Sequence, residues 1–296
     1  MITKPETLQQ ASKRQKKEGL RIAWSRFSLD LDKRTYVMGV LNRTPDSFSD
    51  GGKYMSEESA VSYALNMARD GADIIDIGGE STRPGALPVD VNEELGRVIP
   101  VIKRLKALID IPISIDTSKS HVAKAALENG ASMVNDITGL KGDRDMAGVV
   151  ARFDVPICIM HMKGSPRTMQ ISPQYDDLIG EIIASLRESI DLAAGAGIDE
   201  KKIIIDPGIG FGKTLEHNLK IIKELRRLTN LGRPILIGPS RKSFIGQILN
   251  SDVSERLTGT SSSVALAISN GANIVRVHDV REMVDCARVA DSICRA

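Results

Sequence analysis

Aromatic residues and net charge are both scarce in this sequence, and each shortage limits what the chain can bind. Phe, Trp and Tyr together make up 3% of the 296 residues, which provides no stacking platform for single-stranded nucleic acid. The formal net charge is only +2, because basic and acidic residues are nearly balanced. Composition therefore gives no support to nucleic-acid binding, and we expect no nucleic-acid partner.

Long hydrophobic runs and a cysteine framework are also lacking. No apolar run approaches the length of a membrane span, and residues 1–21 are polar and Lys-rich, unlike a signal peptide. The three cysteines, Cys158, Cys286 and Cys294, have neither metal-site spacing nor a paired pattern, so reduced thiols in a cytosol are expected. The sequence predicts a soluble, cytoplasmic protein with no membrane partner, beginning with a polar leader over residues 1–19.

What the sequence does contain is a regular alternation of apolar runs and helix-like segments. A chain that is 42% hydrophobic and 26% charged suits one large α/β domain with a sizeable core. Residues 20–24 and 27–31 predict a short antiparallel ribbon that closes one end of the domain. Eight candidate strands follow, at residues 36–41, 74–77, 111–115, 132–134, 156–160, 202–205, 234–237 and 273–277. Segments with helical periodicity follow these strands, at residues 56–70, 91–109, 119–129, 143–152, 175–194, 215–229, 254–270 and 280–293.

Eight strand–helix units in strict alternation predict an α/β fold, a single (β/α)8 TIM barrel over residues 20–296. A doubly wound sheet would also alternate, but it usually has a Gly-rich dinucleotide-binding turn after its first strand. Residues 40–45 do not fit such a turn, so the barrel is the favoured fold.

Polar residues follow nearly every predicted strand. In barrels of this kind, the reacting groups lie where strands end and the loops to the helices begin. The polar residues at these positions include Asn42, Asp76, Asp116, Asn135, His161, Asp206, Ser240, Arg276 and His278. Each has an ordinary structural explanation when taken singly, since an Asp before a helix usually caps it. Their recurrence around the barrel favours a functional rim.

One stretch concentrates charge at the mouth of a strand. An apolar run over residues 234–237 leads into two adjacent cations, Arg241 and Lys242. Each needs a partner, because desolvating an unpaired charge is expensive. An internal salt bridge would be the simplest explanation for either one alone, but the recurring pattern at the other strands favours a ligand site.

The residue types at the rim suit a flat nitrogen heterocycle. Asp116, Asn135 and Asp206, with mixed donors beside them, would match the alternating donor–acceptor edge of such a ring. Met160 and Phe211 could contact its two faces.

An anion site is the second expectation. Arg276 and His278 lie on the same side of an alternating strand, and no covalent nucleophile is in view, which suits a phosphorylated or diphosphate-bearing substrate. Residues 208–214 resemble a P-loop only superficially, because Pro207 stands where that motif needs Gly. The four histidines lack zinc-site spacing.

Five motifs together resemble the dihydropteroate synthase family. They are NRTPDSFSDGG (42–52), DIIDIGGESTRPG (73–85), IDPGIGFGK (205–213), GPSRKSFIG (238–246) and RVHD (276–279). The resemblance runs from about Tyr36 to the end, with the motifs in family order and spacing. It implies a barrel that condenses 6-hydroxymethyl-7,8-dihydropterin diphosphate with p-aminobenzoate, giving 7,8-dihydropteroate and pyrophosphate in folate biosynthesis.

The resemblance also implies roles for individual residues. The pterin-binding residues would be Asp116, Asn135, Asp206, Lys242, Met160, Phe211 and Gly238. The diphosphate would be bound by Asn42, Arg276 and His278, with Asn42 also meeting Mg²⁺, the implied cofactor. The p-aminobenzoate site would include Phe48, Thr82, Arg83, Pro84 and Ser243.

The implied mechanism is dissociative, and its catalytic residues would be Asn42, Asp116, Asp206 and Lys242. Loss of diphosphate leaves a cationic pterin methylene, which the aniline nitrogen attacks. A homodimer is also implied. Arg43 departs from the family pattern, since many members have an apolar residue there, and the leader is longer than usual.

Three other functions remain open at this point. One is a related barrel that transfers a methyl group from a reduced pterin or folate to a corrinoid partner. The SRKS segment (240–243) argues against it, as does the RPG sequence (83–85) in the loop after the second predicted strand, called the second loop below. The others are a catalytically silent pterin-binding paralogue and a Lys-dependent aldolase with Lys242 as nucleophile.

Overall fold

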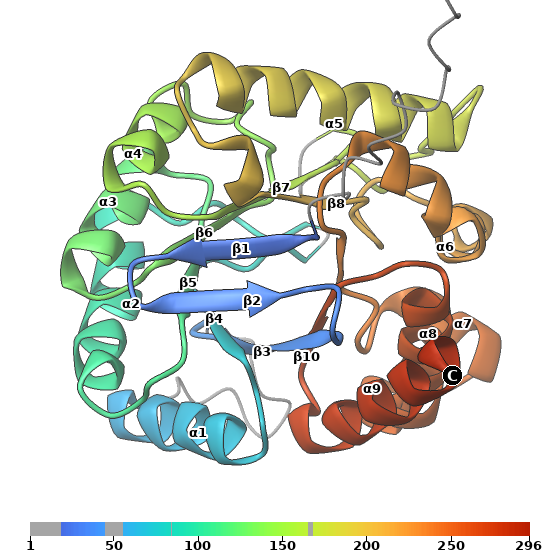
Figure 1. Cartoon of the computed structure of the whole chain (residues 1–296), viewed down its shortest axis with the longest axis horizontal. Helices are drawn as coiled ribbons and strands as arrows, with labels where there is room; N and C mark the ends of the chain where they lie inside the picture. The colour runs from blue at the N-terminus through green and yellow to red at the C-terminus, as the bar shows by residue number, and fades with distance from the viewer. Residues whose placement is uncertain (1–18, 45–55, 84, 165–167) are drawn as a thin grey trace, which may run out of the picture.

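The computed structural model describes residues 19–44, 56–83, 85–164 and 168–296, and these form the predicted barrel (Figure 1). Its parallel strands are β3 (Tyr36–Asn42), β4 (Ile74–Gly78), β5 (Ile113–Asp116), β6 (Met133–Asp136), β7 (Ile157–Met160), β8 (Ile203–Asp206), β9 (Leu236–Ile237) and β10 (Ile274–Val277). Their spatial order is β8-β7-β6-β5-β4-β3-β10-β9. A bridge between Ile205 and Ile235 joins β8 to the segment before β9, so the sheet closes on itself.

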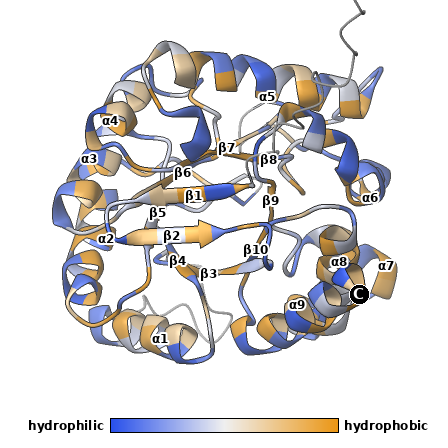
Figure 2. Cartoon of the chain, viewed as in Figure 1, coloured by the Kyte–Doolittle hydropathy of each residue, from blue (hydrophilic) through white to orange (hydrophobic). Residues whose placement is uncertain are grey.

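Helices surround the strands on the outside. They are α1 (Glu57–Arg69), α2 (Val91–Lys106), α3 (Ser120–Asn129), α4 (Met146–Phe153), α5 (Leu178–Gly195), α6 (Leu215–Glu224), α7 (Ser243–Leu249), α8 (Leu257–Ser269) and α9 (Val280–Arg295). Figure 2 shows hydrophobic strands inside a ring of helices that have mixed faces. The strands are buried by side chains of the barrel interior on one face and by the helices on the other, so their sequences read as continuous apolar runs.

The predicted ribbon is present as β1 (Arg21–Trp24) and β2 (Phe27–Asp30), paired antiparallel. It lies across the barrel at the end where the strands begin (Figure 1). The backbone N–H of Asp30 donates to the hydroxyl of Tyr36, the first residue of β3, at 2.8 Å. β1 also contacts η1 (Glu200–Lys202), the turn that precedes β8. The ribbon therefore covers the amino-terminal end of the strands and leaves the carboxyl-terminal end for a site.

The two ends of the barrel sequence are tied together. β10 pairs with β3, with Ile274 opposite Tyr36. The backbone N–H and the hydroxyl of Thr35 donate to the carboxylate of Asp291 on α9, at 2.6 and 2.9 Å. The first barrel strand is thus held by the last strand and the last helix.

The structure departs from the predicted elements in two places near β9. This strand has only two residues, because Pro234 has no N–H for the sheet and the chain leaves it at Gly238-Pro239. A short helix that the sequence did not predict, α7, then occupies part of the connection to α8. The helix predicted over residues 215–229 also ends earlier, at Glu224, and continues as the 3-10 turn η2 (Leu225–Leu231).

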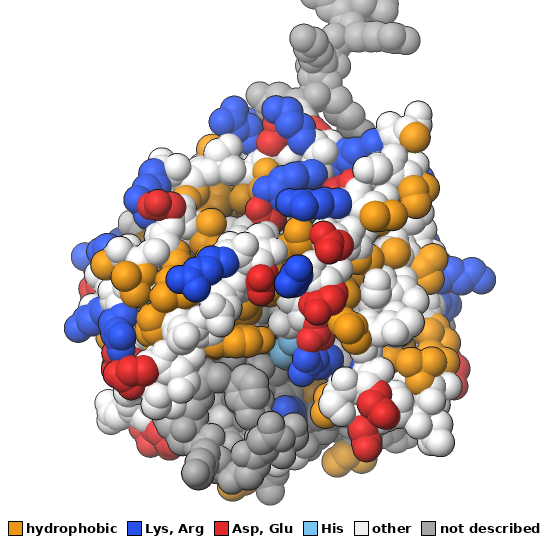
Figure 3. All heavy atoms as spheres, turned by 90° about the horizontal axis from the view of Figure 1, so that it is seen from below, with side chains coloured by type: hydrophobic (Ala, Val, Ile, Leu, Met, Phe, Trp, Pro, Cys, Tyr) orange, Lys and Arg blue, Asp and Glu red, His pale blue; other side chains and the backbone are white. Residues whose placement is uncertain are grey.

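On the face drawn in Figure 3, Lys and Arg side chains are interspersed with Asp and Glu, in line with the small net charge. Among the described segments, no helix combines the length and the apolarity that a membrane crossing needs.

Candidate active site

Four residues at the carboxyl ends of neighbouring strands lie in one register. Asn42 of β3 is paired with Gly78 of β4, Gly78 with Asp116 of β5, and Asp116 with Asn135 of β6. A Cβ added to Gly78 would lie 3.6 Å from both Asn42 Oδ1 and Asp116 Oδ2. Gly78 therefore leaves a small space between an amide oxygen and a carboxylate at the rim.

Arg276 is the centre of a buried charge cluster. Its Nε donates to Asp76 Oδ2 and its Nη2 donates to Asp116 Oδ2, each at 2.6 Å. Asn135 Nδ2 donates to the same Asp76 oxygen at 3.1 Å. Asp76 is fully buried, so its charge depends on these donors for compensation. Residues from four different strands are thereby fixed relative to one another.

Burial shifts the pKa values of the rim groups toward neutrality. Burial raises the pKa of Asp116 to about 7, against the opposing charge of Arg276. Burial likewise raises the pKa of Asp206 to about 6, although the N–H of Gly208 donates to Asp206 Oδ1 at 2.7 Å. Burial lowers the pKa of Lys242 to about 8. Carboxylic acids and an amine that titrate near pH 7 in one cleft are typical of a functional site.

Lys242 and two apolar side chains form the other wall. Its Nζ lies 4.3 Å from the centroid of the Phe211 ring, a cation–π contact. Phe211 and Met160 belong to one small apolar cluster with Ile137 and Met169, separate from the main core. Met160 is paired with Asp206 across β7 and β8, so this cluster borders the acceptors. The rim thus combines an acceptor edge with an apolar surface.

The comparisons with known proteins agree with this arrangement. The family model of pterin binding enzymes matches residues 38–278. A dihydropteroate synthase of Synechocystis sp. is 51% identical over 90% of this chain and 92% of its own length. The chain belongs to the dihydropteroate synthase family. It is therefore a transferase, as the motifs predicted.

Solved structures of dihydropteroate synthases have the same fold. The Yersinia pestis enzyme in a sulfonamide drug complex has a TM-score of 0.90 at 42% identity, covering 93% of this chain and all of that one. The Xanthomonas albilineans enzyme in complex with 7,8-dihydropteroate has a TM-score of 0.82 at 42% identity, covering 91% of this chain and 97% of that one.

The two residues predicted to bind an anion, Arg276 and His278, lie at the same rim but differ in charge. Arg276 is a cation, because Asp76 and Asp116 outweigh the effect of burial and raise its pKa. His278 Nδ1 lies 3.0 Å from Ser240 Oγ, and burial lowers the pKa of the imidazole to about 3. His278 is therefore neutral at pH 7, and it can act on an anion only as a hydrogen-bond donor.

The two adjacent cations of the 234–246 stretch have different partners. Arg241 has a positive φ of 57° and donates from Nε to Asp279 Oδ2 at 3.0 Å. For Arg241, the simpler explanation of an internal salt bridge is thus confirmed. Lys242 faces Phe211 instead, with the carboxylates of Asp206 and Asp116 near enough to affect its pKa.

The residues expected to contact p-aminobenzoate are only partly within the described structure. Phe48 and Pro84 fall outside the described residues. Arg83 and Ser243 are exposed and Thr82 is half-buried. Ser243 lines a cavity of about 550 Å³ bordered by α6, α7 and the loop residue Gln170. Gly238, expected in the pterin slot, directly follows β9, and a Cβ added there would lie 3.7 Å from Arg276 Cβ.

Sequence reasoning named Asp76 and His161 among the polar residues at the strand ends but assigned no partner to either, and it gave Lys213 no role at the rim. Asp76 interrupts the apolar run of β4, and that interruption was the available signal for a buried partner. Lys213 Nζ lies 3.0 Å from His161 Nδ1 and donates to the Phe211 carbonyl at 2.9 Å. Burial lowers the pKa of Lys213 to about 7 and that of His161 to about 3. The pair joins the loops after β7 and β8, a contact that no sequence spacing indicates.

Arg43, the departure from the family pattern, is buried next to Asn42. Its backbone N–H donates to the Gly78 carbonyl at 2.7 Å, which continues the strand pairing one residue beyond β3.

Proposed function

We propose that this chain condenses 6-hydroxymethyl-7,8-dihydropterin diphosphate with p-aminobenzoate, giving 7,8-dihydropteroate and pyrophosphate in folate biosynthesis. The observation that carries this proposal is the convergence of Asp116, Asn135, Asp206 and Lys242 beside the Met160–Phe211 surface. These side chains offer the acceptors, donor and apolar faces that a pterin ring requires. The likeness to an enzyme solved with 7,8-dihydropteroate supports the same reading.

The pterin is bound by its polar edge. Asp206 is held by the Gly208 N–H through one oxygen, so its second oxygen can accept from the ring. Lys242 serves as a fixed donor whose Nζ lies over the Phe211 ring, and Asn135 contributes its amide beside Asp116. Gly238 and Met160 complete the slot.

The reaction is dissociative. The bond between the pterin methylene and the diphosphate oxygen breaks first, the bonding electrons leave with the diphosphate, and a cationic methylene remains. Asp116 and Asp206 stabilise this cation as carboxylates, which is favourable because a positive charge nearby lowers their raised pKa values. The aniline nitrogen, neutral at pH 7, attacks the methylene and then loses its proton to solvent.

Arg276 and His278 bind the leaving diphosphate. The Nε bond to Asp76 holds the guanidinium in place, while Nη2 can exchange Asp116 for a phosphate oxygen. That exchange would free Asp116 at the moment when the cation forms. Neutral His278 adds a hydrogen bond, and Asn42 meets the diphosphate from β3.

Mg²⁺ fits this site as a cofactor bound mainly through the substrate. Within residues 19–44, 56–83, 85–164 and 168–296, no group of three or more His, Cys, Asp or Glu could hold a metal ion by itself. Mg²⁺ usually keeps several waters and takes one or two protein oxygens together with substrate phosphates. The space above Gly78, with Asn42 Oδ1 on one side, suits such a partial site. When bound there, Mg²⁺ would neutralise charge on the diphosphate.

p-Aminobenzoate binds between the second loop and α7, where Thr82, Arg83 and Ser243 would contact it; Phe48 and Pro84 remain the other two residues of the predicted set. Arg83 supplies the cation for its carboxylate, and Ser243 lines the neighbouring cavity between α6 and α7.

The protein is a cytoplasmic homodimer in this proposal. Its three cysteines are unpaired, as in a reducing compartment. Leu266 on α8 and Val289 and Ile293 on α9 are 58%, 61% and 72% exposed, so these adjacent helices carry apolar surface that a partner would cover. A monomer by sedimentation analysis at micromolar concentration would contradict the dimer.

The decisive experiment measures pyrophosphate release from the pterin diphosphate with Mg²⁺, in the presence and absence of p-aminobenzoate. We expect release to be coupled to formation of dihydropteroate. Binding of the pterin without condensation would refute the proposal and favour the silent paralogue.

A Lys-dependent aldolase has one observation in its favour, since the lowered pKa of Lys242 would suit a nucleophile. The cation–π contact with Phe211 favours the donor role instead. Trapping of a carbonyl substrate on Lys242 by borohydride would reverse this assignment.

A further inference from the structure

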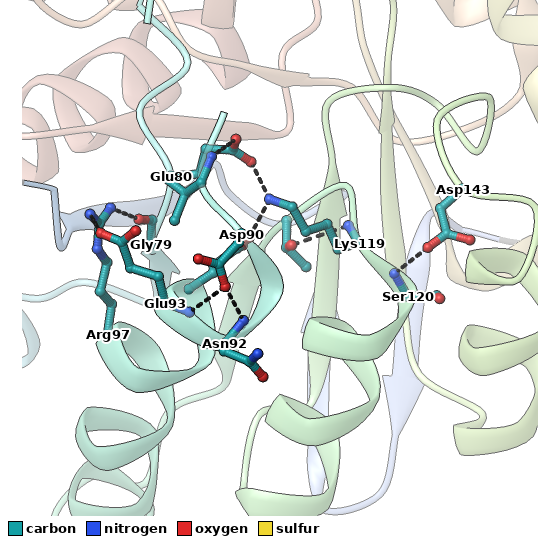
Figure 4. A network of polar contacts seen from close by, with 12 residues as sticks. Gly79, Glu80, Asp90, Asn92, Glu93, Arg97, Lys119, Ser120 and Asp143 are labelled. Atoms are coloured by element: carbon teal, nitrogen blue, oxygen red, sulfur yellow. Dashed lines mark hydrogen bonds and ion pairs between the residues drawn. The ribbon is translucent and has the colours of Figure 1, made fainter. Parts of the chain in front are cut away.

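Lys119 stands at the junction of three segments near the rim. It precedes α3 and follows Asp116 by three residues. Its Nζ lies 2.6 Å from Glu80 Oε2, in the loop after β4, and 2.6 Å from Glu94 Oε2, in the first turn of α2 (Figure 4). One ammonium group therefore joins the second loop, α2 and the turn after β5.

Glu80 closes the second loop at its base. Its other oxygen, Oε1, accepts the backbone N–H of Val89 at 2.9 Å, so the two ends of the segment between Glu80 and Val89 are held together. This segment contains Thr82 and Arg83. The orientation of Thr82 and Arg83 therefore depends on the Glu80 carboxylate, which Lys119 binds.

Helix α2 holds the start of the second loop in place. Arg97 Nη1 donates to the Gly79 carbonyl at 2.6 Å and also pairs with Glu93 (Figure 4). The carboxylate of Asp90 accepts the N–H groups of Asn92 and Glu93 and caps the helix. The start of α2 is therefore fixed by these contacts, and the Lys119 ammonium joins it to the loop through Glu94 and Glu80.

The Lys119 contacts are largely shielded from solvent. The Glu94 side chain is completely buried, and those of Glu80 and Lys119 are 21% and 22% exposed. Burial alone would lower the pKa of Lys119, but the two carboxylates outweigh it and raise the pKa, so the ammonium is charged at neutral pH. Removing one partner of such a cluster leaves an uncompensated buried charge.

The turn that bears Asp116 is held independently of the Lys119 side chain. The N–H of Lys119 donates to Thr117 Oγ1 at 3.2 Å, and the N–H of Ser120 donates to Asp143 Oδ2 at 2.8 Å. Loss of the Lys119 side chain would leave these bonds in place. The perturbation would then fall on the second loop and not on Asp116.

We propose that Lys119 is a positioning residue that sets the second loop against the rim and thereby determines how the aromatic amine substrate is held. The kinetic part of this inference rests on the proposed function. Lys119 is not among the residues proposed to contact substrate, so its loss acts through Glu80 on Thr82 and Arg83. The loss should therefore weaken binding of p-aminobenzoate more than binding of the pterin.

The test uses Lys119→Met combined with Glu94→Gln, which removes the buried charge that Lys119→Met alone would leave unpaired. Lys119→Arg is the conservative variant, and Lys124→Met is the control. Lys124 lies on α3, the helix that Lys119 precedes, and pairs with Glu128 at 3.9 Å, with both side chains about half exposed. We expect the double variant to raise KM for p-aminobenzoate by about tenfold, which is the change that loss of one modest interaction would produce. Its affinity for the pterin should stay within about twofold of wild type. Lys119→Arg should recover most of the loss, and Lys124→Met should change nothing.

Hydrogen exchange of the segment between Glu80 and Val89 provides a readout that does not need catalysis. We expect faster exchange there in the double variant, while the β5–α3 turn stays protected. Unchanged hydrogen exchange in the double variant would overturn the inference, whether or not the wild-type protein condenses its substrates. Failure of the wild-type protein to condense its substrates would count against the proposed function alone. A parallel loss of pterin affinity and p-aminobenzoate affinity would also overturn it, because that pattern indicates general damage to the rim.

Discussion

Asp206 should make the folded protein less stable at neutral pH than an uncharged side chain of the same shape would. Its carboxylate is buried, and burial raises its pKa from 3.8 to about 6. The Gly208 N–H that donates to Asp206 Oδ1 can equally donate to the amide oxygen of Asn. Asp206→Asn therefore keeps the local hydrogen bond and removes the charge.

The size and sign of this effect follow from linkage. A raised pKa in the folded state means that the folded protein favours the protonated form, so stability is full below about pH 4 and is lost as pH rises through about 6. About two pKa units at about 1.4 kcal/mol each give a cost of about 3 kcal/mol at pH 8. Asp206→Asn should be more stable than wild type by up to this amount at pH 8, and the difference should shrink toward zero by pH 4.

Equilibrium urea unfolding of both proteins at pH 8 and pH 4 measures this difference directly. The control is Asp110→Asn, since the Asp110 side chain is 98% exposed and its removal should leave stability nearly unchanged at both pH values. A variant less stable than wild type at pH 8, or a difference independent of pH, would refute the reasoning. Activity should be lost in Asp206→Asn, because the same charge that destabilises the fold is the one assigned to the cationic intermediate.

Three further predictions concern the same rim. Lys242→Ala should weaken pterin binding by roughly 1–3 kcal/mol, because a buried charge-assisted donor is lost; unchanged affinity by calorimetry would remove Lys242 from the slot. Arg276→Lys should lower the free energy of unfolding by about 2–3 kcal/mol, because an ammonium cannot reproduce the fork between Asp76 and Asp116; equal urea midpoints would contradict this. Gly208→Ala should lower the melting temperature by several degrees, because Gly208 has a φ of 71° and a Cβ there would overlap the His161 carbonyl; a melting temperature equal to wild type would show that the loop can adjust.

The barrel could be predicted from the sequence because its strands are buried on both faces and its helices are not. That difference appears as apolar runs alternating with helical periodicity, and it gave the correct strand positions. The connection after β9 was less predictable, since Pro234 and Gly238-Pro239 shorten the strand and nothing in residues 243–249 distinguishes a short helix from a loop.

The sequence predicted which residues lie at the rim better than it predicted which of them contact one another. Strand ends mark which residues face the site, but sequence spacing carries no information on which carboxylate meets which cation across the barrel. For this reason the contacts of Asp76 and Lys213 were missed, although Asp116, Asn135, Asp206 and Lys242 were assigned to the site. The proposed role of the second loop in substrate binding rests only on the family resemblance, because the contacts that hold this loop depend on Lys119, which is distant in sequence.

The pairing of β3 with β10, and of Thr35 with Asp291, has a consequence for synthesis of the protein. The first barrel strand emerges from the ribosome early, yet one of its two neighbours is encoded more than 230 residues later. Until then its edge is open to pairing with other chains, the situation that favours aggregation and chaperone binding. Nascent chains that stall before residue 274 should therefore be poor folders, and a premature stop codon within the last helix should reduce yield more than its distance from the rim suggests.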